Sequence, residues 1–152
     1  MNSLLTSAVE QVVNKMIPIV ASAGNDDQSA CFQNPGSEPL VFTVGATDNQ
    51  DNKLTRSNHG SCLDIFVPGG GIESAHPTLG YVTKSGTSMA APLQAGVFAA
   101  LLSTYSYPNI DALYKQVIDW STKGIVQCIP NIETPNRLLY VPFPKWEPQP
   151  KL

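Results

Sequence analysis

The chain has 152 residues, about the length of one ordinary domain. Nine basic and twelve acidic residues give a net charge of -3, which argues against nucleic-acid binding, because such binding needs clustered Lys and Arg. Hydrophobic residues make up 42% of the chain and charged residues 14%, so the chain can bury a core. No apolar run is long enough to span a membrane, and residues 1–15 lack the features of a signal peptide.

The first two elements in chain order are a helix and a buried strand. Apolar residues recur at steps of three and four over residues 3–16, which predicts an amphipathic helix. The short β-branched run of residues 17–21 predicts a buried strand that ends in a turn at Gly24 and Asn25. A helix followed by such a strand is typical of an α/β fold.

The middle of the chain continues this pattern. Residues 40–45 and 63–67 are apolar runs that predict buried parallel strands, and residues 80–85 predict one more strand. Residues 88–103 are apolar on nearly every side, which predicts a central buried helix. A third helix is predicted from Pro108 and Asn109 to about residue 120.

The C-terminal end differs in composition from the rest of the chain. Four of the thirteen prolines lie within the last twelve residues. Proline-rich segments of this kind favour extended backbone. We therefore predict one domain over residues 1–141 and a Pro-rich tail over residues 142–152 that is extended or disordered.

Residues 85–92, SGTSMAAP, combine a strand end, a glycine, two hydroxyl side chains and the start of a helix. A serine at a helix N-terminus faces the positive end of the helix dipole and free backbone N–H groups, which stabilise negative charge that develops beside it. The nucleophile of an acyl transfer needs such a setting. Taken alone, a string of this kind is better explained by Thr87 or Ser88 acting as a helix cap.

The whole string resembles the nucleophile motif of the subtilisin-like serine proteases, with most likeness to the proteinase K branch. The resemblance covers about residues 2–141 and implies a partial subtilisin-like α/β fold, a mostly parallel sheet flanked by helices that lacks the N-terminal half. Four further segments resemble family motifs in the family's order, namely IVASAGN at 19–25, EPLVFTVGAT at 38–47, SNHGSCLDIFVPGGGI at 57–72 and TPNRLLY at 134–140.

The resemblance assigns roles to particular residues. Ser88 would be the nucleophile, and Asn25 together with the Ser88 backbone N–H would stabilise the oxyanion. Ser22, Ala23 and Gly24 would form one wall of the specificity pocket. Without the resemblance, Asn25 is an ordinary turn residue after a strand. The implied function is that of a secreted serine endopeptidase that hydrolyses peptide bonds in extended peptide or protein substrates.

The family's catalytic Asp and His precede the segment that matches this chain, so we expect both to be missing here. His59 and His76 lie in predicted loops and read as solvated surface residues rather than bases. Without a base, Ser88 is an ordinary hydroxyl, and the chain alone is expected to be almost inactive. The alternatives are a non-catalytic remnant that acts as a binding or regulatory module, or an enzyme restored by a separate N-terminal half.

The resemblance also implies two stabilising features and no cofactor for the chemistry itself. Several relatives carry a disulfide at the positions of Cys31 and Cys62, for which two buried free thiols are the alternative. Members of the branch bind calcium at positions that match the carbonyls of Pro39 and Val41 and the carboxylate of Asp64. Such oxygen ligands suit a structural calcium ion, although Asp64 could equally cap a strand end.

Overall fold

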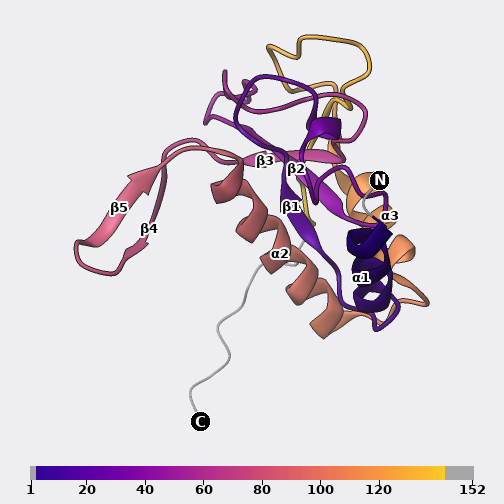
Figure 1. Cartoon of the computed structure of the whole chain (residues 1–152). Coiled ribbons are helices and arrows are strands. Elements are labelled where there is room, and N and C mark those ends of the chain that lie inside the picture. Colours follow the sequence, from indigo (N-terminus) through magenta and orange to yellow (C-terminus); the bar gives the residue numbers. More distant parts are fainter. Residues whose placement is uncertain (1–2, 143–152) are drawn as a thin grey trace.

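A single mostly parallel sheet organises the part of the chain that the computed structural model describes, residues 3–142 (Figure 1). Its strand order is β1-β2-β3-β7-β6, in which the first four strands are parallel and β6 pairs antiparallel with β7. The strands are β1 (Val20–Ser22), β2 (Phe42–Thr47), β3 (Ile65–Pro68), β6 (Thr122–Lys123) and β7 (Arg137–Leu138).

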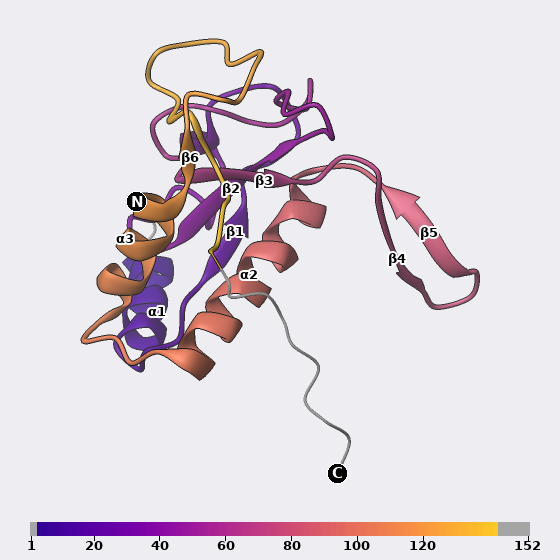
Figure 2. The ribbon, with the colours of Figure 1, turned by 180° about the vertical axis from the view of Figure 1, so that it is seen from behind.

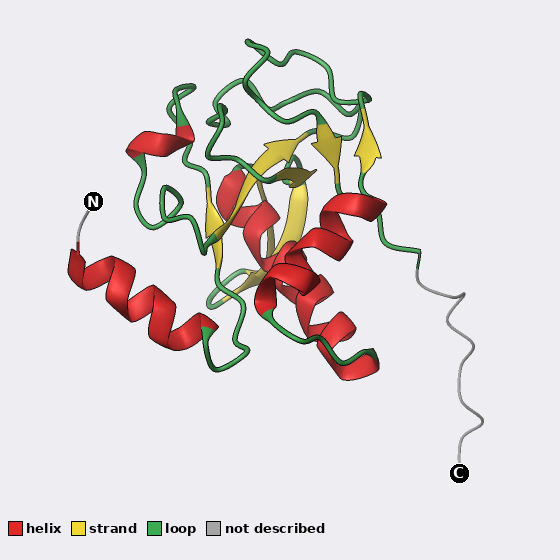
Figure 3. Cartoon of the chain, turned by 90° about the vertical axis from the view of Figure 1, so that its right-hand side faces the viewer, coloured by secondary structure: helices red, strands yellow, loops and turns green. Residues whose placement is uncertain are grey.

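Within residues 3–142, three α-helices and one short 3-10 helix accompany the sheet (Figure 2, Figure 3). Helix α2 crosses β1, β2 and β3, so it lies against the centre of the sheet. This arrangement confirms the predicted α/β class. The helices are α1 (Ser3–Val13), η1 (Ala30–Phe32), α2 (Thr87–Thr104) and α3 (Ile110–Trp120).

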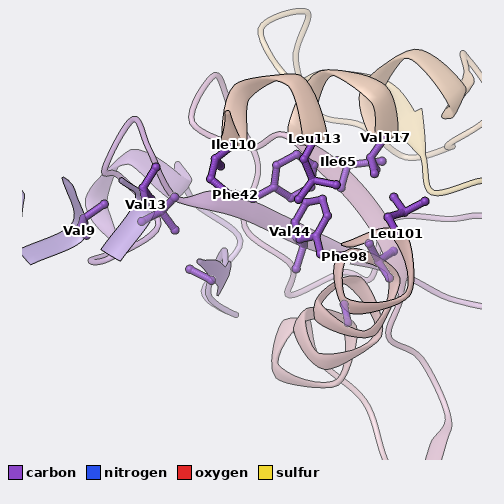
Figure 4. Packing of buried hydrophobic residues seen from close by; sticks show 14 of the residues in the cluster. Val9, Val13, Phe42, Val44, Ile65, Phe98, Leu101, Ile110, Leu113 and Val117 are labelled. Atoms are coloured by element: carbon purple, nitrogen blue, oxygen red, sulfur yellow. The ribbon is translucent and has the colours of Figure 1, made fainter. Parts of the chain in front are cut away.

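The main core lies between the three α-helices and one face of the sheet. Phe42 and Val44 alternate along β2 and point into this cluster, where both are almost completely buried (Figure 4). The Phe42 ring lies 5.0 Å from the ring of Phe98 on α2 and 4.9 Å from that of Tyr114 on α3. These aromatic contacts fix both helices on the same strand.

A smaller cluster lies on the opposite face of the sheet. Gly45 leaves room there for the Phe66 ring, because a Cβ atom at Gly45 would meet that ring at 2.7 Å. Ala30 and Leu63 belong to the same cluster, and the disulfide between Cys31 and Cys62 joins the segments that carry them.

The three strands predicted for this sheet exist but begin later than their apolar runs. The parallel pairing of β1 with β2 begins at Val20 and Phe42, although apolar residues precede both. Pro18 has no N–H to donate, and Val41 is buried without belonging to the ladder. Apolar patterning reports burial, whereas a strand begins where the backbone hydrogen bonds begin.

Three strands were not predicted. Strand β4 (Ile72–His76) forms an antiparallel hairpin with the predicted strand β5 (Gly80–Lys84). The hairpin extends away from the sheet (Figure 1), so its residues show no clear apolar alternation. Strands β6 and β7 have two residues each, which is too short for any periodicity.

Helix α2 is less buried than predicted. One side of the helix faces the interior, but the opposite side is open, and Leu93 on it is 43% exposed. The buried residues of the helix are Thr87, Ala90, Gln94, Phe98 and Leu101.

Within the described residues, no helix is both long and apolar enough to cross a membrane. Residues 143–152 of the predicted Pro-rich tail lie outside the described residues.

Candidate active site

Two glycines position the start of α2, at the place where the residue before the helix contacts the loop after β3. Gly86, with φ 149°, immediately precedes the helix and donates its N–H to the carbonyl of Gly69 at 2.8 Å. A Cβ atom at Gly69 would lie 2.7 Å from the Cβ of Ala46, so the loop after β3 can pass this closely only as glycine. Ser88 is the second residue of α2, and it is exposed.

Asn25 lies next to this helix start. Its Oδ1 accepts hydrogen bonds from the backbone N–H of Thr87 at 3.0 Å and from the Thr87 hydroxyl at 3.3 Å. These contacts orient the carboxamide, because its oxygen faces the helix and its Nδ2 donor is left free. Within residues 3–142, neither Asn25 Nδ2 nor the Ser88 N–H has an acceptor. Asn25 thus contacts the residue before Ser88, and its Nδ2 and the Ser88 N–H are two donors of the kind that stabilise an oxyanion.

Two hollows flank this pair of residues. Ser22 and Gly24 line a groove of about 410 Å³ together with Ser88. Ala23 is completely buried and does not line the groove. A second cavity of about 340 Å³ is bordered by Asn25, and its other lining residues are Leu54, Thr55, Arg56, Ser85 and Gly86.

Neither histidine reaches Ser88. The His59 ring contacts the Asn131 amide, with 3.4 Å between Nδ1 and Nδ2. His76 Nδ1 accepts the backbone N–H groups of Thr78 and Leu79 in the turn of the β4–β5 hairpin, at 3.3 and 3.2 Å. In the described part of the chain, therefore, no imidazole is hydrogen-bonded to the Ser88 hydroxyl.

Comparison with known proteins decides the family. The model of the subtilase family, which is the S8 peptidase family, matches residues 2–127. This chain belongs to the subtilase family. It is 40% identical over 136 residues to the subtilisin-like serine protease AsES of Sarocladium strictum, covering 90% of this chain and 35% of that protein. It is 37% identical over 144 residues to an extracellular serine proteinase of a Thermus species, covering 93% of this chain and 35% of that protein.

A solved structure agrees with this assignment. The crystal structure of a cold-adapted subtilisin-like serine proteinase superposes with a TM-score of 0.85 at 36% identity. The match covers 92% of this chain and 50% of that one. The fold is therefore subtilisin-like, and the chain spans about a third of the length of the curated relatives and half of the solved one.

The three residues predicted to hold calcium lie around one cavity of this subtilase. Pro39, Val41 and Asp64 all line a hollow of about 260 Å³. Asp64 Oδ2 accepts the Thr43 N–H at 2.6 Å. Burial raises the pKa of the Asp64 carboxyl to about 6, although the Thr43 N–H and the charge of Arg137 both lower it.

This donor set fits a hard cation. The hollow is lined by a carboxylate whose burial is unfavourable in the ionised form, and a cation would offset that penalty. Among the described residues, no group of three or more His, Cys, Asp or Glu side chains is placed to hold a metal ion, so backbone carbonyls would have to complete this site.

The predicted disulfide is confirmed, since Cys31 and Cys62 are joined and their Cα atoms lie 5.2 Å apart. Cys128 is a free, exposed thiol.

The sequence did not reveal the roles of Thr87 and Asn58, both of which contact the loop that carries Asn25. Their position within the SGTS and SNHG motifs was the available signal.

Proposed function

We propose that this chain supplies the nucleophile and the oxyanion hole of a serine endopeptidase. The observation that carries the proposal is the contact of Asn25 Oδ1 with Thr87, which places Asn25 against the residue before the exposed Ser88. The groove on one side and the cavity on the other suit a substrate that extends in both directions from the scissile bond.

In this mechanism the Ser88 oxygen attacks the peptide carbonyl carbon while a general base takes its proton. The carbonyl oxygen becomes an anion, which Asn25 Nδ2 and the Ser88 N–H stabilise by hydrogen bonds. The C–N bond then breaks, and the amine leaves with the proton from the base. Water hydrolyses the resulting ester by the same steps and restores the serine.

We infer that the base and its carboxylate partner come from a segment outside these 152 residues. Both histidines of the chain have partners elsewhere. Strand β1 has a neighbour on one side only within the described sheet, and α2 beside it exposes apolar residues. An additional segment would cover both. Alone, the chain should be almost inactive, because losing the triad histidine of subtilisin itself costs about 10⁶ in turnover.

The test is labelling of Ser88 by a serine-reactive phosphonate, detected by mass spectrometry of the modified peptide. The chain is assayed alone and together with an N-terminal catalytic-domain segment that carries the family's Asp and His motifs. We expect labelling only in the mixture, its loss in Ser88→Ala, and its retention in Ser103→Ala, a control at an exposed serine near the other end of α2. Failure to label Ser88 in the mixture would favour a non-catalytic binding module.

We further propose that the intact protein acts outside the cell. A disulfide persists in oxidising compartments, and the Thermus relative is named as an extracellular proteinase. Periplasmic or extracellular recovery of Cys31–Cys62 in its oxidised form, by non-reducing peptide mapping of the native protein, tests this proposal. Recovery of the protein only in the cytoplasm, with both thiols reduced, would contradict it.

We also propose that Pro39, Val41 and Asp64 hold a structural calcium ion through two backbone carbonyls and one carboxylate. The clustering of these groups around one hollow supports the proposal. The ion would neutralise the Asp64 carboxylate and join the segment before β2 to the segment before β3. It takes no part in the peptide hydrolysis.

A further inference from the structure

We propose that Asn58 is a positioning residue that holds the oxyanion donor Asn25 in place. This inference rests on the proposed role of Asn25. Asn58 lies 33 positions after Asn25 in the chain and does not line either hollow beside Ser88. It would act on the reaction through the backbone of the loop that carries Asn25.

The contacts of Asn58 enclose Asn25 from both sides. Its side-chain Oδ1 accepts the N–H of Asp26 at 2.9 Å and the N–H of Gln28 at 3.1 Å. Its Nδ2 donates to the carbonyl of Ala23 at 2.9 Å, and its backbone N–H donates to the carbonyl of Gly24 at 2.9 Å. One residue therefore binds four backbone groups of the loop over residues 23–28.

Asn58 is buried beside a loop of unusual backbone conformation, so the loss of its hydrogen bonds would be costly. Its relative exposure is 0%, so water cannot replace a bond that is lost. A Cβ atom at Gly24 would lie 2.5 Å from Asn58 Nδ2, which shows how closely the loop backbone approaches the carboxamide. Gly24 has φ 100° and Asp27 has φ 52°, so the loop has a left-handed backbone on both sides of Asn25. A loop of this shape needs external partners to stay in one conformation.

The chemistry of the contacts requires asparagine. The side chain must accept two N–H groups at one end and donate to a carbonyl at the other, and only a carboxamide does both. Aspartate would keep the two accepted bonds, but it would bury a charge and place a carboxylate oxygen against the Ala23 carbonyl. Alanine would lose all three side-chain bonds and leave buried backbone groups without partners.

Residues close to Asn58 in the sequence make further contacts with the loop that carries Asn25, but these contacts are more exposed to water than those of Asn58. The Arg56 carbonyl accepts the N–H of Asp27 at 3.0 Å, and Arg56 Nε donates to the carbonyl of Asn25 at 3.1 Å. Lys53 Nζ contacts Asp27 Oδ1 at 2.8 Å. Arg56 and Asp27 are both exposed, so water can replace these contacts in part. Asn58 supplies the bonds that water cannot replace.

The experiment measures amide hydrogen exchange of Thr87 in the 152-residue chain by NMR. The Thr87 N–H is bonded to Asn25 Oδ1, so its exchange rate reports whether the carboxamide is in place. The rate is expressed relative to the Val44 amide in the central strand, so that a loss of global stability cancels. Asn136→Ala is the matched control, because Asn136 also binds backbone groups on both ends, those of Val126 at 3.0 and 2.9 Å.

We expect Asn58→Ala and Asn58→Asp each to raise the relative exchange rate of Thr87 about tenfold or more. Asn136→Ala should leave the ratio unchanged. An unchanged ratio in Asn58→Ala, or an equal rise in Asn136→Ala, would overturn the proposal. If Asn58→Ala does not fold, Asn58→Asp decides in the same way. The readout involves no reaction at Ser88, so failure of the phosphonate labelling would refute the enzyme function and leave this result intact.

Discussion

The ammonium group of Lys53 is enclosed by four oxygen atoms close to the candidate active site. Lys53 Nζ donates to the carbonyls of Leu54, Thr55 and Ser57 at 3.2, 3.3 and 2.9 Å and to Asp27 Oδ1 at 2.8 Å. The lysine side chain is 4% exposed, whereas that of Asp27 is 55% exposed. The main contribution therefore comes from satisfying the three carbonyls, of which that of Ser57 is buried, rather than from the ion pair.

We predict that Lys53→Met lowers the free energy of unfolding by about 1–3 kcal/mol, because it leaves the buried Ser57 carbonyl and its two neighbours without this donor. Lys115→Met is the control, since Lys115 pairs with Asp119 on the surface of α3 and both side chains are exposed. That change should cost less than about 0.5 kcal/mol. Urea unfolding of both variants measures the difference, and equal losses would contradict this role of Lys53.

Asp64 gives a second prediction at the scale of single residues. Its pKa of about 6 lies above the ordinary value of 3.8, so the fold favours the protonated carboxyl. Without a cation, stability should therefore fall as the pH rises from about 4 to about 6, and the loss persists at higher pH. A calcium ion bound at the proposed site would offset this penalty where the carboxyl is ionised. We expect millimolar calcium to raise the unfolding temperature more at pH 7.5 than at pH 4.5.

The control for this prediction is a second carboxylate. Asp64→Asn should abolish the calcium-dependent rise, whereas Asp26→Asn, at an exposed position, should retain it. Thermal unfolding followed by circular dichroism gives the comparison. A calcium effect of equal size at both pH values, or one that persists in Asp64→Asn, would refute the proposed site.

The residues that could be predicted from the sequence differ in kind from those that could not. Ser88 and Asn25 lie in motifs whose resemblance to the family is specific, so their roles were assigned from the sequence. The contacts of Thr87 and Asn58 join segments 30 to 63 positions apart. No local pattern in the sequence encodes which backbone group such a side chain will meet.

At the scale of elements, the disulfide joins two segments on the face of the sheet opposite α2. It connects η1 to the residues just before β3 and closes a separation of 31 positions. A loop of that length restricts the unfolded chain, which stabilises the folded state by roughly 3–4 kcal/mol. Residues just after η1 line the groove, and the segment before β3 lines the proposed calcium hollow.

We predict that Cys31→Ser lowers the unfolding temperature substantially, in line with that estimate. Cys128→Ser should have little effect, because Cys128 is free and exposed. Differential scanning calorimetry under non-reducing conditions compares the two variants. The prediction fails if the Cys31 and Cys128 substitutions lower the unfolding temperature by the same amount.

The apolar pattern of the sequence predicts the long buried elements but not the short or exposed strands. The runs that predicted β2 and β3 are long and buried on both faces, so they could be read from composition. The hairpin strand β4 and the two-residue strands β6 and β7 lack such runs. Helix α2 was predicted within one residue at each end, but its one-sided burial could not be predicted, because its apolar residues surround the helix.

At the scale of the whole molecule, one side of this chain has the features of an interior surface. Strand β1 is an edge strand, and α2 next to it exposes Leu93 to 43%. The β4–β5 hairpin extends from the body without other strands beside it (Figure 1). Open edges and apolar faces of this kind favour association with another segment.

We predict that Leu93→Asp leaves the fold of the isolated chain intact and prevents labelling of Ser88 when the N-terminal segment is added. A charge on an exposed position costs little in the free chain but is costly once that position is covered. Ile132→Asp is the control, since Ile132 is fully exposed on a distant loop. Circular dichroism checks the fold, and equal labelling of both variants would show that α2 is not covered.

The central claim is that Asn25 and Ser88 act together on one acyl oxygen. The most direct measurement is the rate at which the phosphonate modifies Ser88 in the mixture with the N-terminal segment, for the natural chain and for Asn25→Ala. We predict that Asn25→Ala slows the reaction strongly, by analogy with the loss of about 10²–10³ known for the oxyanion asparagine of subtilisin itself. An unchanged rate, or modification of a serine other than Ser88, would contradict the claim.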